Sequence, residues 1–197
     1  MSHHTAQDLV PVHGGCERPV DRIVPLKDRS RLIEEANGLT DVKVTAADLS
    51  TVYRLGDGAL SPLEGPMKSD EWQQVLEEAS IVRGGKRYAW TIPLALPVTE
   101  TEAAAISAGA SVAIRNESGD LVAVVDDAEV FDWDKAHYVT SVYGTERFDH
   151  PGGRMVENDP RNKLLGGSIR VLPQPVNVEY GEFMLSPSRV RALIRDR

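Results

Sequence analysis

The stretch from Gly58 to Met67, Gly-Ala-Leu-Ser-Pro-Leu-Glu-Gly-Pro-Met, lies between two segments with helical periodicity. Pro62 and Pro66 fix the backbone angle φ and lack an N–H donor, whereas Gly58 and Gly65 permit sharp changes of direction. A generic surface loop does not need this combination of rigid and permissive residues. We therefore expect a shaped corner that sets how the flanking helices meet the rest of the fold.

Helix signals stand on both sides of this corner. Upstream, Thr45 is suited to cap a helix whose apolar positions run to Leu55 and which ends at Gly56. Downstream, Ser69 is expected to cap a second helix with an acidic first turn, and Trp72 begins the apolar face of that helix. The corner is thus predicted to join two helices.

Strand and helix patterns alternate through the remaining segments. Residues 111–115 and 121–125 flank a glycine-containing turn, which predicts an antiparallel hairpin. Residues 90–98 predict a buried strand in which Pro93 requires an edge position or a bulge. Further short strands are expected at 22–24, 42–44, 129–133 and 164–172, and further helices at 31–36, 102–109, 134–142 and from Ser186 onward. The chain is therefore predicted to be a single α+β domain.

Charge and composition exclude several classes of protein. The formal net charge is −8 and the sequence pI is near 5.1, which disfavours a nucleic-acid partner because phosphate binding depends on clustered Lys and Arg. No apolar run approaches the roughly 20 residues that span a bilayer, so no membrane partner is expected. The amino terminus does not resemble a secretion signal, and Cys16 is the sole cysteine. A cytoplasmic location is expected.

Few residues are candidates for chemistry. His13 precedes two glycines, and His150 stands between Asp149 and a proline turn, with Arg154 four residues further on. Each histidine is expected to have a structural role first, and His13, His150 and Arg154 are also candidates for an interface or an anion site. The acids from Asp126 to Glu129 are expected to form a solvated rim. No spacing predicts a catalytic group, a cofactor site or a metal site.

Several blocks resemble the amino-terminal domain of ATP sulfurylase (sulfate adenylyltransferase). The corner resembles that family's hallmark segment, with Leu60 and Pro66 where phenylalanine is usual. Further similar blocks, in the family's order, are Val-Tyr-Gly-Thr-Glu-Arg-Phe-Asp-His-Pro-Gly-Gly at 142–153, Leu-Leu-Gly-Gly-Ser-Ile-Arg-Val-Leu at 164–172, and the helix start at Ser186. The block at 142–153 has Glu146-Arg147 where the family has aspartate. The resemblance covers nearly the whole chain.

This resemblance implies a PUA-like domain over residues 1–197, with a small, mostly antiparallel β-barrel and flanking helices. The family's catalytic nucleotide-binding motifs are not in the sequence, since Arg161-Asn162 is followed by Lys163 and not by proline. The implied role is a structural and interface module that packs on an ATP sulfurylase catalytic domain, in the same longer chain or as a separate subunit. The parent reaction, ATP plus sulfate giving adenylyl sulfate and pyrophosphate, places ATP and magnesium in that other domain. A homo-oligomer remains open.

Two alternatives remain. A free-standing protein that binds a small anion or a nucleotide would recruit His13, His150 or Arg154. An RNA-binding PUA-type module would require a basic face and salt-sensitive binding, against the acidic balance of this chain.

Overall fold

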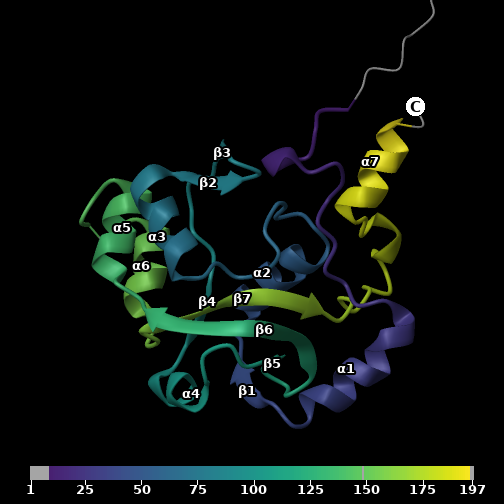
Figure 1. The fold of residues 1–197 in the computed structure, drawn as a ribbon, viewed down its shortest axis with the longest axis horizontal. Helices are drawn as coiled ribbons and strands as arrows, with labels where there is room; N and C mark the ends of the chain where they lie inside the picture. The colour runs from purple at the N-terminus through teal and green to yellow at the C-terminus, as the bar shows by residue number, and fades with distance from the viewer. Residues whose placement is uncertain (1–8, 148, 196–197) are drawn as a thin grey trace, which may run out of the picture.

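A five-stranded mixed sheet forms the centre of the molecule (Figure 1). The computed structural model describes residues 9–147 and 149–195. The strand order is β1-β5-β6-β7-β4, and a separate hairpin joins β2 to β3. The strands are β1 (Thr40–Lys43), β2 (Ser80–Arg83), β3 (Lys86–Ala89), β4 (Leu96–Val98), β5 (Val112–Arg115), β6 (Leu121–Asp132) and β7 (Lys163–Val171).

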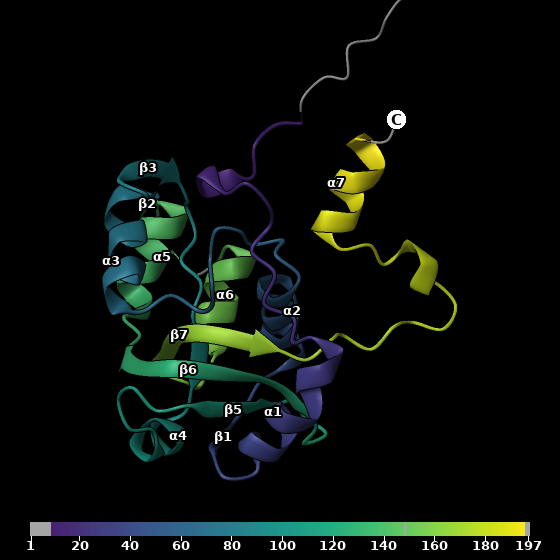
Figure 2. The same ribbon diagram turned by 45° about the vertical axis from the view of Figure 1, so that its right-hand side comes forward.

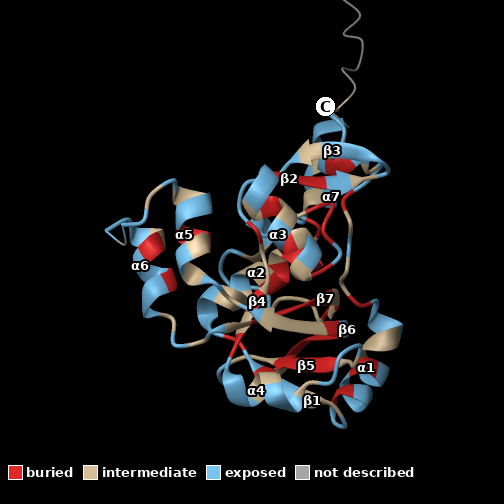
Figure 3. Cartoon of the chain, turned by 60° about the vertical axis from the view of Figure 1, so that its left-hand side comes forward, coloured by how far each residue is buried: buried red, intermediate tan, exposed pale blue. Residues whose placement is uncertain are grey.

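Helices surround the sheet and cover its faces (Figures 1 and 2). The α-helices are α1 (Arg29–Ala36), α2 (Ala46–Gly56), α3 (Ser69–Glu78), α4 (Glu100–Ala105), α5 (Lys135–Tyr143), α6 (Pro151–Asn158) and α7 (Pro187–Arg195). Three short 3-10 helices are η1 (His13–Gly15), η2 (Leu26–Asp28) and η3 (Gly181–Phe183). Helices α5 and α6 project together to one side of the sheet (Figure 3).

The predicted α+β class is confirmed, but the small, mostly antiparallel barrel is wrong. Strand β1 pairs with β5 in parallel, with Val42 opposite Ile114, so the sheet is mixed. The strands β1 and β4 form its two edges, and the β2–β3 hairpin does not extend it. The sheet is therefore an open half-barrel. Strand direction at β1 was not readable from sequence because an alternating pattern suits both pairings.

The corner from Gly58 to Met67 pairs its own backbone with β7. The Gly167 N–H donates to the Pro66 carbonyl at 2.9 Å, and the Ile169 N–H donates to the Glu64 carbonyl at 2.9 Å. A Cβ atom at Gly65 would overlap the Gly167 carbonyl and come within 2.9 Å of the Ile169 nitrogen. Glycine is thus required because two backbones approach closely, in addition to its role in turning the chain.

One large apolar core lies between this sheet and α2, α3 and α5 (Figure 3). Helix α2 begins with the expected cap, because Thr45 and Asp48 form a reciprocal capping box. Leu55, Leu63 and Met67 are each 1% exposed, so the helix and the corner share this core. A second, smaller cluster lies beneath α1.

Three local expectations were wrong or only partly right. Ser69 is the first residue of α3 and Lys68 holds the cap position, so the predicted cap is displaced by one residue. Within 90–98 only Leu96–Val98 is a strand, since Pro93 cannot donate to a ladder. At 22–24 an isolated parallel bridge between Ile23 and Val171 replaces the expected strand.

Candidate functional site

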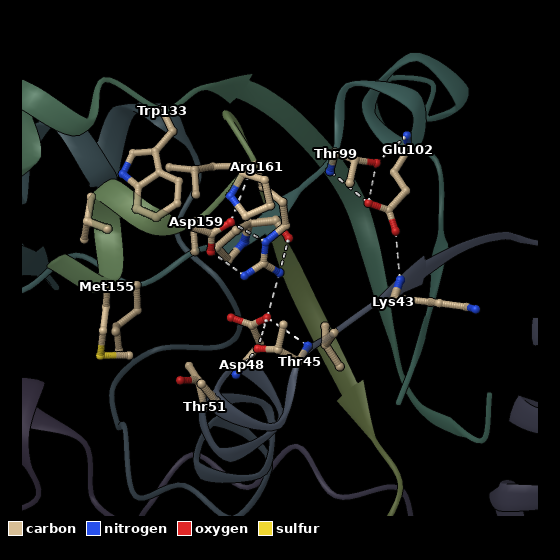
Figure 4. A pocket seen from close by; sticks show the side chains of 18 of the residues that line it. Lys43, Thr45, Asp48, Thr51, Thr99, Glu102, Trp133, Met155, Asp159 and Arg161 are labelled. Carbon is tan, nitrogen blue, oxygen red and sulfur yellow. Dashed lines mark hydrogen bonds and ion pairs between the residues drawn. The ribbon is translucent and has the colours of Figure 1, made fainter. Parts of the chain in front are cut away.

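An open cleft of about 910 Å³ lies between the start of α2, strand β4 and the segment that joins α6 to β7 (Figure 4). Its wall is largely apolar and includes Trp72, Leu94, Trp133, Tyr138, Met155 and Leu164. The indole Nε1 of Trp133 is buried and has no hydrogen-bond partner in the described part of the chain. Burial, and then the neighbouring Tyr143, raise the pKa of Tyr138 to about 12. The cleft is thus an aromatic-walled hollow at the meeting point of three elements.

Arg161 joins these elements through a network of charged hydrogen bonds (Figure 4). Its Nη1 donates to Asp48 Oδ2 at 2.7 Å and to the Pro97 carbonyl at 3.2 Å. Its Nε and Nη2 donate to the two carboxylate oxygens of Asp159 at 2.8 and 2.6 Å, a bidentate pair. Asp48 Oδ2 also accepts from the Thr45 N–H at 3.0 Å. The cap of α2, strand β4 and the residues before β7 are therefore held by one guanidinium.

The network is largely shielded from solvent. The side chains of Arg161, Asp48 and Asp159 are 11%, 12% and 15% exposed, so each charge depends on its partners in place of water. Burial would raise the pKa of Asp159, but hydrogen bonds from Arg161 outweigh that effect and the pKa lies below its usual value. Burial likewise opposes the charge of Arg161, and the two carboxylates still raise its pKa. Asp159 and Arg161 are therefore both charged at neutral pH.

This cleft does not have the chemistry of an anion site. All three nitrogens of Arg161 donate to protein acceptors, so a phosphate or sulfate could reach it only by displacing a carboxylate. Glu102 and Glu117 add further negative charge to the lining. Glu102 caps α4 and accepts from the Lys43 N–H at 2.9 Å. The mutual pairing of Arg161, Asp48 and Asp159 therefore stabilises the fold, and Lys43 is the other basic residue of the lining.

His13 lies in η1 against the β2–β3 hairpin. Its Nε2 is 2.9 Å from the Ala89 carbonyl, so this nitrogen carries the proton. The ring lies 5.8 Å from the Tyr88 ring and 6.0 Å from the Trp90 ring, centre to centre. These contacts attach the amino-terminal segment to β3.

His150 and Arg154 lie at the start of α6, on a different element from His13. His150 Nδ1 accepts from the Gly152 N–H at 3.1 Å and so caps the helix. Its ring centre is 4.5 Å from that of Tyr143, which holds α6 against α5. Arg154 Nη2 donates to the Asp149 carbonyl at 3.2 Å. The structure brings two of the three candidate residues together, and each of the three makes a structural contact.

Of the acids from Asp126 to Glu129, Asp127 is exposed as expected of a solvated rim, whereas Asp126 and Glu129 are half-buried. A bulge in β6 separates them, and Asp127 has a positive φ of 53°. Asp126 accepts from Arg170 at 2.6 Å, Asp127 pairs with Lys68, and Glu129 accepts from the Ser69 hydroxyl. Each carboxylate joins β6 to β7 or to the start of α3. The bulge shifts the register of β6, so these acids do not follow the simple alternation of side chains between the two faces of a strand.

The described part of the chain has neither a cluster of metal ligands nor a membrane-spanning helix. Within residues 9–147 and 149–195, no group of three His, Cys, Asp or Glu side chains is placed to hold a metal ion. No helix in these ranges has both the length and the apolar character to cross a bilayer. Cys16 is a free, half-buried thiol.

Sequence reasoning missed the Arg161 network. Asp48 and Arg161 are 113 residues apart in the chain, and neither belongs to a spacing motif of its own. The sequence indicated only the role of Asp48 at the start of α2, because Asp48 at the third helical position completes the capping box with Thr45. The distant arginine that uses the same carboxylate could not be deduced from the sequence.

The half-barrel sheet with its surrounding helices defines the class of this protein. The family model for the PUA-like domain matches residues 10–174, and the chain therefore belongs to the PUA-like domain family. The solved hexameric APS kinase from Thiobacillus denitrificans has a similar fold, with a TM-score of 0.69 over 94% of this chain and 31% of that chain. Its sequence identity is 22%, so this likeness concerns the fold alone.

The curated relatives that the chain matches are sulfate adenylyltransferases, as the motifs predicted. It is 43% identical to that of Pyropia yezoensis over 190 residues, which are 96% of this chain and 44% of the relative. It is 34% identical to that of Ignicoccus hospitalis, over 94% of this chain and 46% of the relative. That of Nostoc punctiforme is 28% identical over all 197 residues, 48% of its length. The chain thus spans about half the length of these relatives.

Proposed function

We propose that this chain is the non-catalytic structural and interface part of a sulfate adenylyltransferase. The observation that carries the proposal is the extent of the match, because nearly all of the chain corresponds to less than half of each relative. The geometry agrees with a supporting role, since Arg161, Asp48 and Asp159 in the cleft are occupied by one another. The remainder of such an enzyme, in the same polypeptide or as a separate subunit, would be its partner.

The chemistry of the parent reaction belongs outside these residues. Transfer of an adenylyl group from ATP to sulfate requires positive charge and oriented donors around the α-phosphate, in a preorganised site. Arg161 is unsuited to that task because both neighbouring carboxylates already neutralise it. ATP and magnesium are accordingly assigned to the remainder of the enzyme, and the parent reaction to sulfate activation in the cytoplasm.

A chimera tests this proposal directly. The matching segment of the Pyropia yezoensis enzyme is replaced by this chain, and sulfate-dependent release of pyrophosphate from ATP is measured with magnesium. The intact Pyropia enzyme and the isolated chain are assayed beside it. We expect turnover by the chimera and no turnover by the isolated chain above a blank without protein.

Two results would contradict the proposal. Turnover by the isolated chain would place an active site within these residues. A chimera that unfolds cooperatively, and is therefore folded, but has no activity would show that the chain does not serve as this part of the enzyme.

The anion-binding alternative has its own measurement. Calorimetric titration of the isolated chain, first with sulfate and then with ATP, would detect a free-standing binding protein. The variant His150→Ala together with Arg154→Ala is the matched control, because these two candidates share the start of α6. Saturable binding that this double variant removes would favour the alternative.

A further inference from the structure

The last segment of the described chain, residues 173–195, is an arm with exposed apolar side chains. None of the described residues from 172 to 195 is buried. More than half of the exposed large apolar side chains in the described part of the chain lie here: Val176, Val178, Tyr180, Phe183, Met184, Leu185, Val190, Leu193 and Ile194. Figure 2 shows the arm standing away from the body of the domain. Such a concentration of apolar surface indicates a binding face.

Helix α7 at the end of the arm is amphipathic. Val190, Leu193 and Ile194 are spaced to share one face, as neighbours on a helix surface. Three arginines occupy the other positions, and they are Arg189, Arg191 and Arg195. The helix is therefore a basic element on a chain whose net charge is −8. One attachment to the body is a hydrogen bond from Arg191 Nη2 to the Val10 carbonyl at 2.6 Å.

The arm lies beyond the PUA-like domain but within the similarity to sulfate adenylyltransferases. The family model ends at residue 174, just after the arm begins. The match to the Nostoc punctiforme enzyme includes all 197 residues. The arm therefore lies outside the family model, and the similarity to a longer enzyme continues through it.

We propose that the apolar face of this arm is the docking surface for the remaining part of a sulfate adenylyltransferase. The surface that receives it is an apolar groove flanked by carboxylates, because Arg189, Arg191 and Arg195 lie beside the apolar face of α7. This inference rests on the proposed function, and it names the residues that make the contact. Apolar anchors at the centre of such an interface carry most of the binding free energy.

Hydrogen exchange tests whether the arm is covered. The exchange rates of the backbone amides of α7 (Pro187–Arg195) are compared between the isolated chain and the Pyropia chimera. We expect exchange in the chimera to be slower by on the order of tenfold or more, since docking suppresses local opening. Amides of β6, in the core of both proteins, are the internal control. Equal rates for α7 in the two proteins would overturn the inference.

Substitution tests which side chains make the contact. The arm variant carries Val190→Ser, Leu193→Ser and Ile194→Ser, residues that are 38%, 38% and 53% exposed. The matched control carries Ile33→Ser, Val82→Ser and Ile92→Ser, which are 47%, 42% and 46% exposed and lie outside the arm. We expect the arm variant to restore fast exchange of α7 in the chimera, whereas the control leaves the exchange slow. Equal effects of the two variants would contradict the assignment.

The two proposals fail separately. An active chimera with an unprotected arm overturns the docking surface and leaves the proposed function standing. An inactive, folded chimera with a protected arm overturns the proposed function and leaves the docking surface standing. Sedimentation of the isolated chain tests whether a second copy of the chain binds the apolar face of the arm. If the isolated chain forms oligomers and the arm variant is monomeric, a second copy covers this face, which would contradict the proposal.

Discussion

Removing the charge of Arg161 offers the sharpest test of how this domain is held together. Arg161→Met keeps an apolar stem and deletes the guanidinium that binds Asp48 and Asp159. Both carboxylates are then left at 12% and 15% exposure without their main cationic partner. Breaking a buried pair costs about 3–5 kcal/mol, and the open side of the cleft favours the lower end of this range, about 3 kcal/mol. The strands and the cap of α2 should remain formed but less stable.

Urea unfolding at pH 7, followed by tryptophan fluorescence, measures this loss. A cost of about 3 kcal/mol corresponds to a fall of roughly 6–12 °C in Tm for a chain of this size. The control is Arg147→Met, because Arg147 and Asp149 form a pair whose side chains are 77% and 58% exposed. Its effect should stay within about 0.5 kcal/mol.

The stability loss caused by Arg161→Met should also depend on pH. In the native protein the pKa of Asp159 is lowered, so its stabilising effect is complete above the unfolded pKa of about 3.9 and is lost as the pH falls further. Without Arg161, burial raises that pKa, and protonation relieves the destabilised carboxylate at a higher pH. The stability difference between native protein and variant should therefore shrink from pH 7 to pH 4. A loss at pH 7 no larger than that of Arg147→Met would refute the reasoning.

Three further predictions concern the scaffold. Thr45→Ala removes the capping box of α2 and should cost about 1 kcal/mol in urea unfolding, and no loss would contradict the cap. Gly65→Ala should cost about 3 kcal/mol or more because its Cβ meets the backbone of β7, whereas Gly38→Ala, with its nearest atom at 3.9 Å, should be nearly neutral. Asp126→Asn should flatten the fall in stability below about pH 4, since hydrogen bonds from Arg170 outweigh burial and lower the pKa of Asp126; an unchanged acid profile would argue against that pairing.

Local features of this fold could be predicted from the sequence because they depend on a few neighbouring residues. The cap at Thr45, the turn between β5 and β6 and the proline start of α7 were all predicted at their positions. Strand β6 is longer than expected because its bulge continues the ladder through the acids. The extent of β4 was overestimated because the apolar residues around Pro93 pack without forming a ladder. Boundaries thus depended on packing, which no short window contains.

The candidate site depended on contacts between distant residues. His150 was expected to be structural, and its role as a helix cap involves only Gly152, two residues away. Arg161, by contrast, reaches Asp48 across 113 residues, and its partner Asp159 lies beside it. The sequence contained both acids without indicating which arginine they share.

The sequence by itself determined the α+β class, the starts of α2 and α7 and the kinship with sulfate adenylyltransferases, because caps, alternation and glycine–proline motifs act over a few residues. Only the tertiary structure decided that the sheet is open and mixed, that Gly65 is needed where two backbones meet, and that Arg161 is neutralised. These features arise when elements pack, since strand direction, backbone proximity and charge burial are properties of pairs of segments. The exposed arm belongs to the same category, because an apolar side chain is exposed only in relation to what the fold leaves uncovered.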